Sequence, residues 1–404
     1  MSPVRATAPD ADRALRRTVH QRLVGSEAVE QLVGVAAPEL RRRLGALLHE
    51  ANPLLATDRH ERLVRELADE VAGLGPLEPL LADPSVTEVM VNGTRGCFVE
   101  RAGRLEQVPL ALDDFAIMRI VERIIAPLGL RLDRASPMVD ARLADGSRLH
   151  AVIPPLAIDG ACVTIRRFGT RTIALEEFAP GEPAAAFLRW AVDAGWNLLV
   201  SGGTSSGKTT LLNAMSGAID PTERVITIEE TAELRLAQPH VVRLEARPAN
   251  AEGAGAVSVR DLVRTALRMR PDRIVVGEVR GAEALDLLQA LNTGHEGALS
   301  TVHANSPLDA LRRIATLSLF SGVALPFEAI TEQVGAAIDV VVQVERGRSG
   351  AREIVAIAEV ENERGSIGVR ELFGRGAGAL GPRGVPSRPL RRRDAPVPDD
   401  SWFA

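Results

Sequence analysis

A single lysine occupies the one segment of this chain where arginine would be a poor substitute. Of the 48 Lys and Arg residues only Lys208 is a lysine, and it lies in the sequence GGTSSGKT at 202–209. This sequence matches G-x-x-x-x-G-K-[ST], a loop whose backbone N–H groups wrap a phosphate while the lysine reaches its outer oxygens. A compact ammonium fits there, whereas a planar guanidinium suits bidentate contacts. The loop requires a strand before it and a helix after it, and it predicts a nucleoside triphosphate site.

The overall composition limits the partners that this chain can take. Its 404 residues, 46% hydrophobic and 25% charged, are enough for two or three globular domains. Aromatic residues make up 3% and the net charge is −5, so no base-stacking platform or basic field favours direct nucleic-acid contact. Cys97 and Cys162 are far apart in sequence, which excludes a cysteine-built zinc site. No run approaches roughly 18 apolar residues, so we expect a cytoplasmic protein that meets the membrane through partners.

The composition and residue spacing change at four points along the chain, and these changes predict five segments. Residues 1–72 mix leucine and valine with charges at helical spacing, and residues 73–170 carry short strand-like runs around one helix. Residues 171–183 contain Pro and Gly and read as a linker. Strands and helices alternate over 184–372, as in a parallel sheet covered by helices. Residues 373–404 are rich in Gly, Pro and Arg and are expected to be disordered. The predicted class is α/β, with a smaller α+β domain and a helical N-terminal region.

The phosphate loop assigns roles to consecutive residues. Its glycines permit close backbone approach and positive φ, and the helix that follows presents its N-terminus to the phosphates. Lys208 is expected to reach the β- and γ-phosphates, and the Thr209 hydroxyl to bind Mg²⁺. The predicted nucleotide-binding residues are Gly202, Gly203, Thr204, Ser205, Ser206, Gly207, Lys208, Thr209 and Thr210.

Two later strands end in carboxylates. The apolar strand Arg273–Val276 is followed by Glu278, which would orient or deprotonate the attacking water. The alternative is a solvated glutamate behind a strand. The strand Arg224–Ile228 is followed by Glu229 and Glu230, which could share metal positioning and water activation. Taken alone, such a pair is more often surface charge.

Two histidines complete the set of candidate residues. His303 directly follows the predicted strand Ala298–Val302, where it could sense the γ-phosphate by hydrogen bonding. His295 precedes the same strand in the sequence TGHEG. Each histidine, considered alone, is more often a packed or surface residue.

Together these motifs resemble those of the type II/type IV secretion and pilus ATPase superfamily. GGTSSGKTT corresponds to its Walker A motif, ITIEETAEL to its acidic box, RPDRIVVGEVRG to its atypical Walker B motif, and TGHEG with STVHANS to its His box. In the first half, GLGPLEPLLADPSVTEVMVNG, DARLADGSRLHAVIPPL and TIRRF resemble the CpaF/TadA branch, the motor of Flp-type tight-adherence pili. The resemblance runs from about residue 58 to residue 372.

The resemblance implies a RecA-like ATPase domain, a smaller PAS-like N-terminal domain and a homo-hexamer with ATP and Mg²⁺ bound between subunits. The ring would drive pilus assembly or protein export through platform proteins at the inner face of the membrane. The second acid of the family's acidic box is commonly Asp, so the role of Glu230 beside Thr209 as a Mg²⁺ ligand is less secure. The implied catalytic residues are Glu278, Glu229, Lys208, His303, His295 and, from the N-terminal domain, Arg142 and Arg148.

Other classes of nucleotide-binding protein fit less well. A guanine-reading N-K-x-D motif is excluded because the lone lysine belongs to the phosphate loop. An L-S-G-G-Q-like signature of ATP-cassette transporters is absent from the sequence. The alternatives that stay open are a conjugation or DNA-transfer ATPase of the same superfamily and a regulatory nucleotide-binding protein without motor activity.

Overall fold

The chain folds into two compact units, Met1–Phe168 and Gly169–Ala404. The computed structural model describes residues 12, 15, 16, 18 and 19, and residues 37–403 except 102, 111, 168–172, 180–181, 251, 348–349, 364–365, 376–379 and 393–394. The first half of the helical region predicted over residues 1–72 lies largely outside the described residues. We describe each unit by itself.

From residue 37 onward, the first two helices of unit 1 are α3 (Ala37–Ala51) and α4 (Thr57–Ala72). Their apolar stripes face each other, with Leu44 of α3 and both Leu63 and Leu67 of α4 fully buried in one cluster. The helical region predicted from the Leu/Val spacing is therefore present from residue 37 onward.

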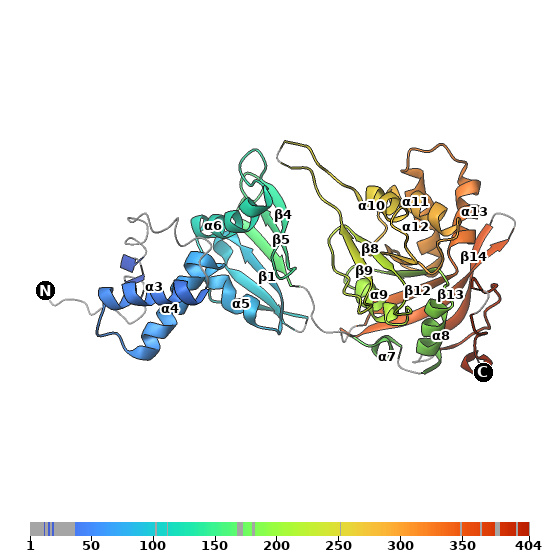
Figure 1. Ribbon diagram of the computed structural model, residues 1–404, viewed down its shortest axis with the longest axis horizontal. Coiled ribbons are helices and arrows are strands. Elements are labelled where there is room, and N and C mark those ends of the chain that lie inside the picture. Colours follow the sequence, from blue (N-terminus) through green and yellow to red (C-terminus); the bar gives the residue numbers. More distant parts are fainter. Residues whose placement is uncertain are drawn as a thin grey trace. The chain divides into compact units, whose positions relative to one another are not determined.

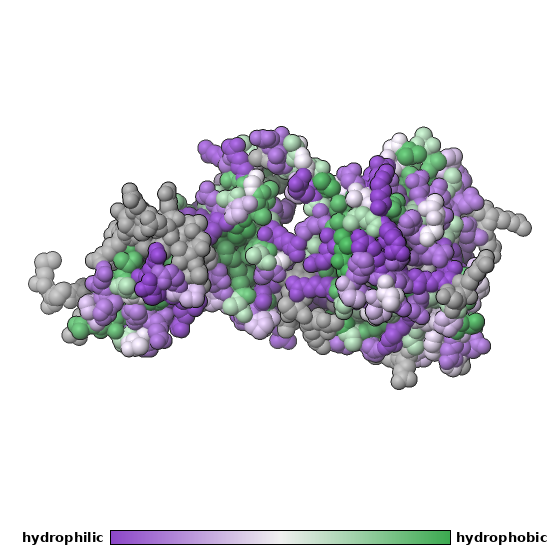
Figure 2. Space-filling model, in the orientation of Figure 1, coloured by the Kyte–Doolittle hydropathy of each residue, from purple (hydrophilic) through white to green (hydrophobic). Residues whose placement is uncertain are grey.

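A six-stranded antiparallel sheet forms the rest of unit 1 (Figure 1). The strand order is β3-β2-β1-β6-β5-β4, with a core against α6 (Asp114–Ile125), whose Ile117 and Val121 are buried. Asp113 caps that helix by accepting a hydrogen bond from the backbone N–H of Ala116. Figure 2 shows a hydrophobic strip over this sheet. The remaining elements are η1 (Gly75–Leu77), α5 (Glu78–Ala82), β1 (Val86–Asn92), η2 (Gly93–Arg95), β2 (Cys97–Arg101), β3 (Arg104–Val108), η3 (Ala126–Leu128), β4 (Met138–Arg142), β5 (Arg148–Val152) and β6 (Cys162–Arg166).

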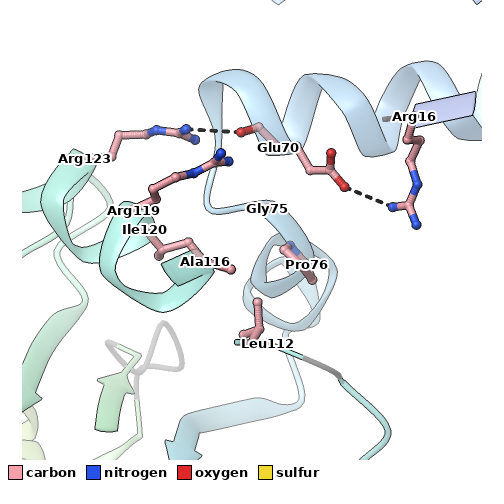
Figure 3. Close-up of a pocket in the computed structure, with 9 residues that line it drawn as sticks. All are labelled: Arg16, Glu70, Gly75, Pro76, Leu112, Ala116, Arg119, Ile120 and Arg123. Carbon is pink, nitrogen blue, oxygen red and sulfur yellow. Dashed lines mark hydrogen bonds and ion pairs between the residues drawn. The ribbon is translucent and has the colours of Figure 1, made fainter. Parts of the chain in front are cut away.

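A cavity of about 510 Å³ lies where α4, η1 and α6 meet (Figure 3). Arg123 of α6 donates hydrogen bonds to the backbone carbonyls of Glu70 and Gly73, which are orphan groups at the end of α4. The Glu70 carboxylate in turn pairs with Arg16 at 2.9 Å. These contacts fix the end of α4 against α6.

Unit 2 is a nine-stranded sheet with helices on both faces (Figure 1). The order is β15-β14-β13-β12-β7-β11-β10-β8-β9; β7 to β12 run parallel, and β13, β14 and β15 are antiparallel. The strands are β7 (Leu198–Gly202), β8 (Val225–Glu229), β9 (Val241–Glu245), β10 (Arg273–Val276), β11 (Leu299–His303), β12 (Val340–Arg346), β13 (Arg352–Glu363), β14 (Ser366–Arg375) and β15 (Leu380–Pro382).

Both faces of the central strands are apolar because helices cover both. Leu198 and Val200 of β7 pack on the side of α7, α8 and α9, whereas Leu199 packs on the side of α10 to α13. Figure 1 shows these two helix layers on opposite sides of the sheet. The helices are α7 (Leu175–Phe178), α8 (Glu182–Asp193), α9 (Lys208–Ser216), α10 (Val259–Ala266), α11 (Glu283–Leu291), α12 (Pro307–Leu319) and α13 (Phe327–Ala337).

The stretch 171–183, predicted as a linker, is partly built into unit 2. It contains α7, whose Leu175 and Phe178 are 4% and 1% exposed. These two apolar side chains pack into the core on the side of the sheet that α8 and α9 cover. Because this burial stabilises the segment against unit 2, the segment is not a free linker.

The C-terminal segment 373–404, predicted to be disordered, also differs in the structure. Beyond the end of β14 it forms β15 and η4 (Asp400–Phe403), and its arginines bind buried carboxylates of the sheet. Asp339, 2% exposed, forms an ion pair with Arg388 at 2.9 Å and accepts a hydrogen bond from the side chain of Arg391 at 2.8 Å. Glu359, fully buried, accepts from the backbone N–H groups of Ser387 and Arg388. The low hydrophobicity of this segment is offset by ion pairs, which composition alone does not reveal.

The same segment ends in an aromatic cluster. Trp402 lies 6.5 Å from Trp190, and Phe403 lies 5.4 Å from Phe373, measured between ring centroids. Trp196 stacks edge-on against Trp190 at 5.0 Å. All three tryptophans of the chain therefore lie in one cluster that includes the C-terminal residues.

Candidate active site

The phosphate loop connects β7, near the middle of the sheet, to α9. Gly207 has φ 98° and Ser205 has φ 57°, left-handed values that glycine adopts freely. A Cβ at Gly202 would collide with the backbone carbonyl of Val344 in the neighbouring β12. A Cβ at Gly203 would meet nothing within 4 Å, so this side of the loop is open to a ligand. The loop thus has the shape that its sequence predicted.

Lys208 lies folded inside this loop. Its ammonium donates to the carbonyl oxygens of Gly202 and Gly203 at 3.2 and 2.9 Å, and lies 3.2 Å from Nδ1 of His303. Burial lowers the pKa of Lys208 to about 8, with the Glu278 charge opposing that shift. A buried ammonium held by neutral carbonyls would gain strongly from an anion placed in the loop.

Glu278 is held in place by its neighbours in the chain. The N–H of Gly277 bonds to the carbonyl of Ile228, and the N–H of Val279 bonds to that of Thr301, so both sides of Glu278 are tied to flanking strands. Its carboxylate reaches Nε2 of His303 at 3.2 Å. The predicted acid therefore faces the lysine through one histidine.

Arg280 links the two predicted acidic positions. Its guanidinium contacts Glu278 at 2.7 Å and Glu230 at 2.7 Å. These carboxylates hold the pKa of Arg280 above its usual value. A continuous polar chain thus runs from Lys208 through His303, Glu278 and Arg280 to Glu230. Burial lowers the pKa of His303, which favours the neutral ring in the middle of this chain.

Glu229 lies at the end of β8 and is 3% exposed. One carboxylate oxygen accepts hydrogen bonds from the backbone N–H groups of Glu233 and Leu234 at 2.6 and 2.9 Å. The other oxygen, Oε1, is buried and has no protein partner. Burial raises the pKa of Glu229 to about 7, against the opposing effect of those two hydrogen bonds. An unsatisfied buried carboxylate oxygen costs stability unless a ligand or water satisfies it.

The structure does not bring His295 to the polar chain that runs from Lys208 to Glu230. It precedes β11, whereas His303 ends that strand, and the P-loop follows the parallel β7 at the same edge as His303. Its Nδ1 lies 3.3 Å from the carbonyl oxygen of Ala290, at the end of α11. His295 is therefore a packed histidine at the edge of the sheet opposite to the phosphate loop and His303.

Arg142 and Arg148 lie directly opposite each other on β4 and β5 of unit 1. Arg148 is also directly opposite Arg166 of β6, so three arginines form one row on the same face of the sheet. The row continues into β1, where Glu88 lies directly opposite Arg166 and places a carboxylate beside the arginines. The sequence did not single out Arg166, because only the register of β5 and β6 brings it into the row.

Comparison with known proteins fits this geometry. The family model described as "Type II/IV secretion system protein" matches residues 70–361. This match covers most of the chain, including both the N-terminal sheet and the polar cluster. The chain belongs to this family.

Several relatives in the family span nearly the same length. A protein of Mycobacterium tuberculosis named for conjugal transfer is 44% identical over 315 residues, covering 75% of this chain and 89% of the relative. The conjugal transfer protein TrbB of Rhizobium radiobacter is 35% identical and covers 75% and 93%. The type IV secretion system protein PtlH of Bordetella pertussis is 38% identical and covers 70% and 93%. The similarity of this secretion-family chain is therefore not confined to the phosphate loop.

Solved structures confirm the predicted fold class. The ATPase DotB of Legionella pneumophila matches with a TM-score of 0.52 at 20% identity, covering 71% of this chain and 80% of that one. The pilus retraction motor PilT matches with a TM-score of 0.52 at 18% identity, covering 70% and 81%. This secretion-family protein has a RecA-like P-loop domain preceded by a smaller N-terminal domain.

The described residues of the site suit Mg²⁺ and a nucleoside triphosphate. They contain no cluster of three or more His, Cys, Asp or Glu side chains that could cage a metal ion. Mg²⁺ instead tends to keep its waters and to bind through few protein oxygens plus substrate phosphates. Thr209, in the first turn of α9, carries the hydroxyl that would contribute one such oxygen, and the unpaired Oε1 of Glu229 could hold a metal-bound water.

Two cations of the site, Arg280 and Arg352, were not predicted from the sequence. Arg280 stands two positions after Glu278, and that spacing beyond a strand end was the available signal. Arg352 donates to the hydroxyl of Thr210 at 3.2 Å, yet lies 142 positions away in sequence. Only the pairing of β12 with β7 brings it to the loop.

Proposed function

We propose that this protein is a mechanical ATPase that powers pilus assembly or protein export, as a hexamer at the cytoplasmic face of a membrane. The observation that carries the proposal is the polar chain from Lys208 to Glu230 at the end of β7. It places an ammonium, a neutral imidazole and a carboxylate around the open side of the phosphate loop. Such groups can neutralise the charge of a terminal phosphate and position the attacking water.

The residues divide the chemistry between them. Lys208 leaves the loop carbonyls to neutralise the terminal phosphate, and His303 hydrogen-bonds to it. Glu278 orients a water for in-line attack on the γ-phosphorus and takes its proton; the bond to the bridging oxygen breaks, yielding ADP and phosphate. The Thr209 hydroxyl would hold Mg²⁺, which would supply charge neutralisation at the phosphates. Arg142 and Arg148 would act from a neighbouring subunit.

Two assays, one of phosphate release from ATP and one of nucleotide binding, together test this function. The wild-type protein is expected to hydrolyse ATP, and Glu278→Gln to bind ATP with near-normal affinity while losing turnover by a factor of about 100 or more. Lys208→Arg keeps the charge but is expected to lose nearly all activity. An exposed substitution on the same sheet, Arg346→Ala, is the control. Wild-type turnover in either site variant would remove the proposed mechanism.

There are two candidates for the cargo that this ATPase would move. The resemblance of the N-terminal domain to the CpaF/TadA branch supports a motor for tight-adherence pili, acting with membrane platform proteins. The names of the Mycobacterium and Rhizobium relatives support a conjugation ATPase instead. No helix in the described part of the chain has the length and apolar character needed to cross a bilayer. Deleting the gene and scoring surface pili and plasmid transfer separately distinguishes the two, because each cargo predicts the loss of one phenotype.

A further inference from the structure

The two strands beside β7 bring different groups to the phosphate loop. On one side, β11 ends in His303, and β10, the next strand, leads into Glu278. On the other side, β12 pairs with β7 and turns back into β13, which begins at Arg352. The loop is therefore flanked by the Lys208 cluster on the β11 side and by Arg352 on the β12 side.

Arg352 is held against the loop by two contacts. Its guanidinium donates to the hydroxyl of Thr210, in the first turn of α9, at 3.2 Å. Its aliphatic stem lies over Gly207, where an added Cβ would come within 2.6 Å of its Cδ. The side chain thus covers the start of the helix whose N-terminus receives the phosphates.

The position of the Lys208 cluster sets the direction of a bound nucleotide. In a phosphate loop the lysine reaches the β- and γ-phosphates, while the loop N–H groups hold the α- and β-phosphates. With the γ-phosphate near Lys208 and Glu278, on the β11 side, the nucleoside end extends toward the β12–β13 side. A guanidinium at that end would meet the α-phosphate, to which it can donate charge-assisted hydrogen bonds.

We propose that Arg352 is a nucleotide-binding residue that contacts the α-phosphate from the same subunit. The proposal rests on the nucleotide hydrolysis proposed above and assigns the residue a distinct part in it. ATP and ADP share the α-phosphate, and its bonds do not change during hydrolysis. The contact therefore strengthens ground state and transition state alike, so it governs affinity and not turnover.

Calorimetric titration with ADP and steady-state hydrolysis of ATP test this assignment. Arg352→Ala is expected to raise the Kd for ADP and the KM for ATP by about tenfold or more, since a charged hydrogen bond is lost. Its kcat at saturating ATP is expected to stay within about twofold of wild type. Arg352→Lys should recover part of the affinity, and Arg352→Gln keeps a long side chain over Gly207 if the alanine variant unfolds. The control is Arg346→Ala, because Arg346 is exposed and directly opposite Arg352 in the same hairpin.

The outcomes separate this inference from the proposed function. If the wild-type protein neither binds ADP nor hydrolyses ATP, the proposed function fails. If the wild type does both, and Arg352→Ala and Arg352→Gln bind ADP as it does, the inference alone is overturned. A fall in kcat with unchanged ADP affinity also overturns it, because Arg352 would then act by supporting the geometry around Lys208.

Discussion

Replacing Glu229 with glutamine should make the protein more stable at alkaline pH while impairing the site. Burial raises the pKa of Glu229 from 4.5 to about 7. The folded state therefore binds this proton more tightly than the unfolded state does. Stability contributed by the protonated carboxyl is fully present below pH 4.5 and is lost as the pH rises toward 7. By linkage, the total loss is about 3 kcal/mol at pH 8.

The glutamine variant removes this titration. It keeps an oxygen for the N–H groups of Glu233 and Leu234, but places an amide at the unpaired Oε1 position. The buried amide costs about 1 kcal/mol or more, so we expect a net gain of about 1–2 kcal/mol at pH 8 and a flatter dependence of stability on pH. For a unit of this size, each kcal/mol corresponds to roughly 2–4 °C in Tm.

Thermal unfolding of wild type and Glu229→Gln between pH 5.5 and pH 8 measures the effect. The matched control is Glu230→Gln, the same change at the adjacent residue, whose side chain is 59% exposed and paired with Arg280. The control should keep the wild-type slope of Tm against pH. An identical slope in Glu229→Gln and wild type would refute the assignment of a buried, titrating carboxylate.

Two further predictions concern the C-terminal segment and the subunit interface. Arg391→Ala removes two charged hydrogen bonds from buried Asp339 and should lower the free energy of unfolding by about 2 kcal/mol, since Asp339 keeps its ion pair with Arg388. The control, Arg383→Ala, changes an exposed arginine and should alter the free energy of unfolding by less than about 0.5 kcal/mol. Urea titration followed by tryptophan fluorescence measures both. Mixing Lys208→Ala with Arg142→Ala subunits should restore part of the phosphate release that each lacks, and the complete absence of rescue at every ratio would contradict an arginine that acts in trans.

The alternating strands and helices of unit 2 could be predicted because local sequence determines them. The run Leu198–Val200 is apolar on both faces, as a central parallel strand must be. Ser258 and Asp261, three residues apart as in a capping box, form that motif at the start of α10. Glu278 and Lys208 could be placed together because parallel strands bring their carboxyl ends to one edge of the sheet.

Other features depend on pairings that one sequence does not reveal. His295 and His303 are close in sequence, but a strand between them sends them to opposite edges. The order of the C-terminal segment depends on Asp339, which directly precedes the apolar strand β12, and on Glu359, which lies within β13. A buried carboxylate needs a cation, and these two acids were the available indication that the arginines at 388 and 391 would be engaged.

Glu359 also shows where this protein can be divided. It is fully buried, and its partners Arg370, Ser387 and Arg388 all lie beyond residue 361, where the family match ends. A chimera that joins the shared segment of this chain to the C-terminal part of a relative would strand a charge in the core unless the donor supplies equivalent cations. The segment that the family model matches is thus shorter than the segment that these contacts tie together, and grafting boundaries should follow the carboxylate partners and not the extent of the match.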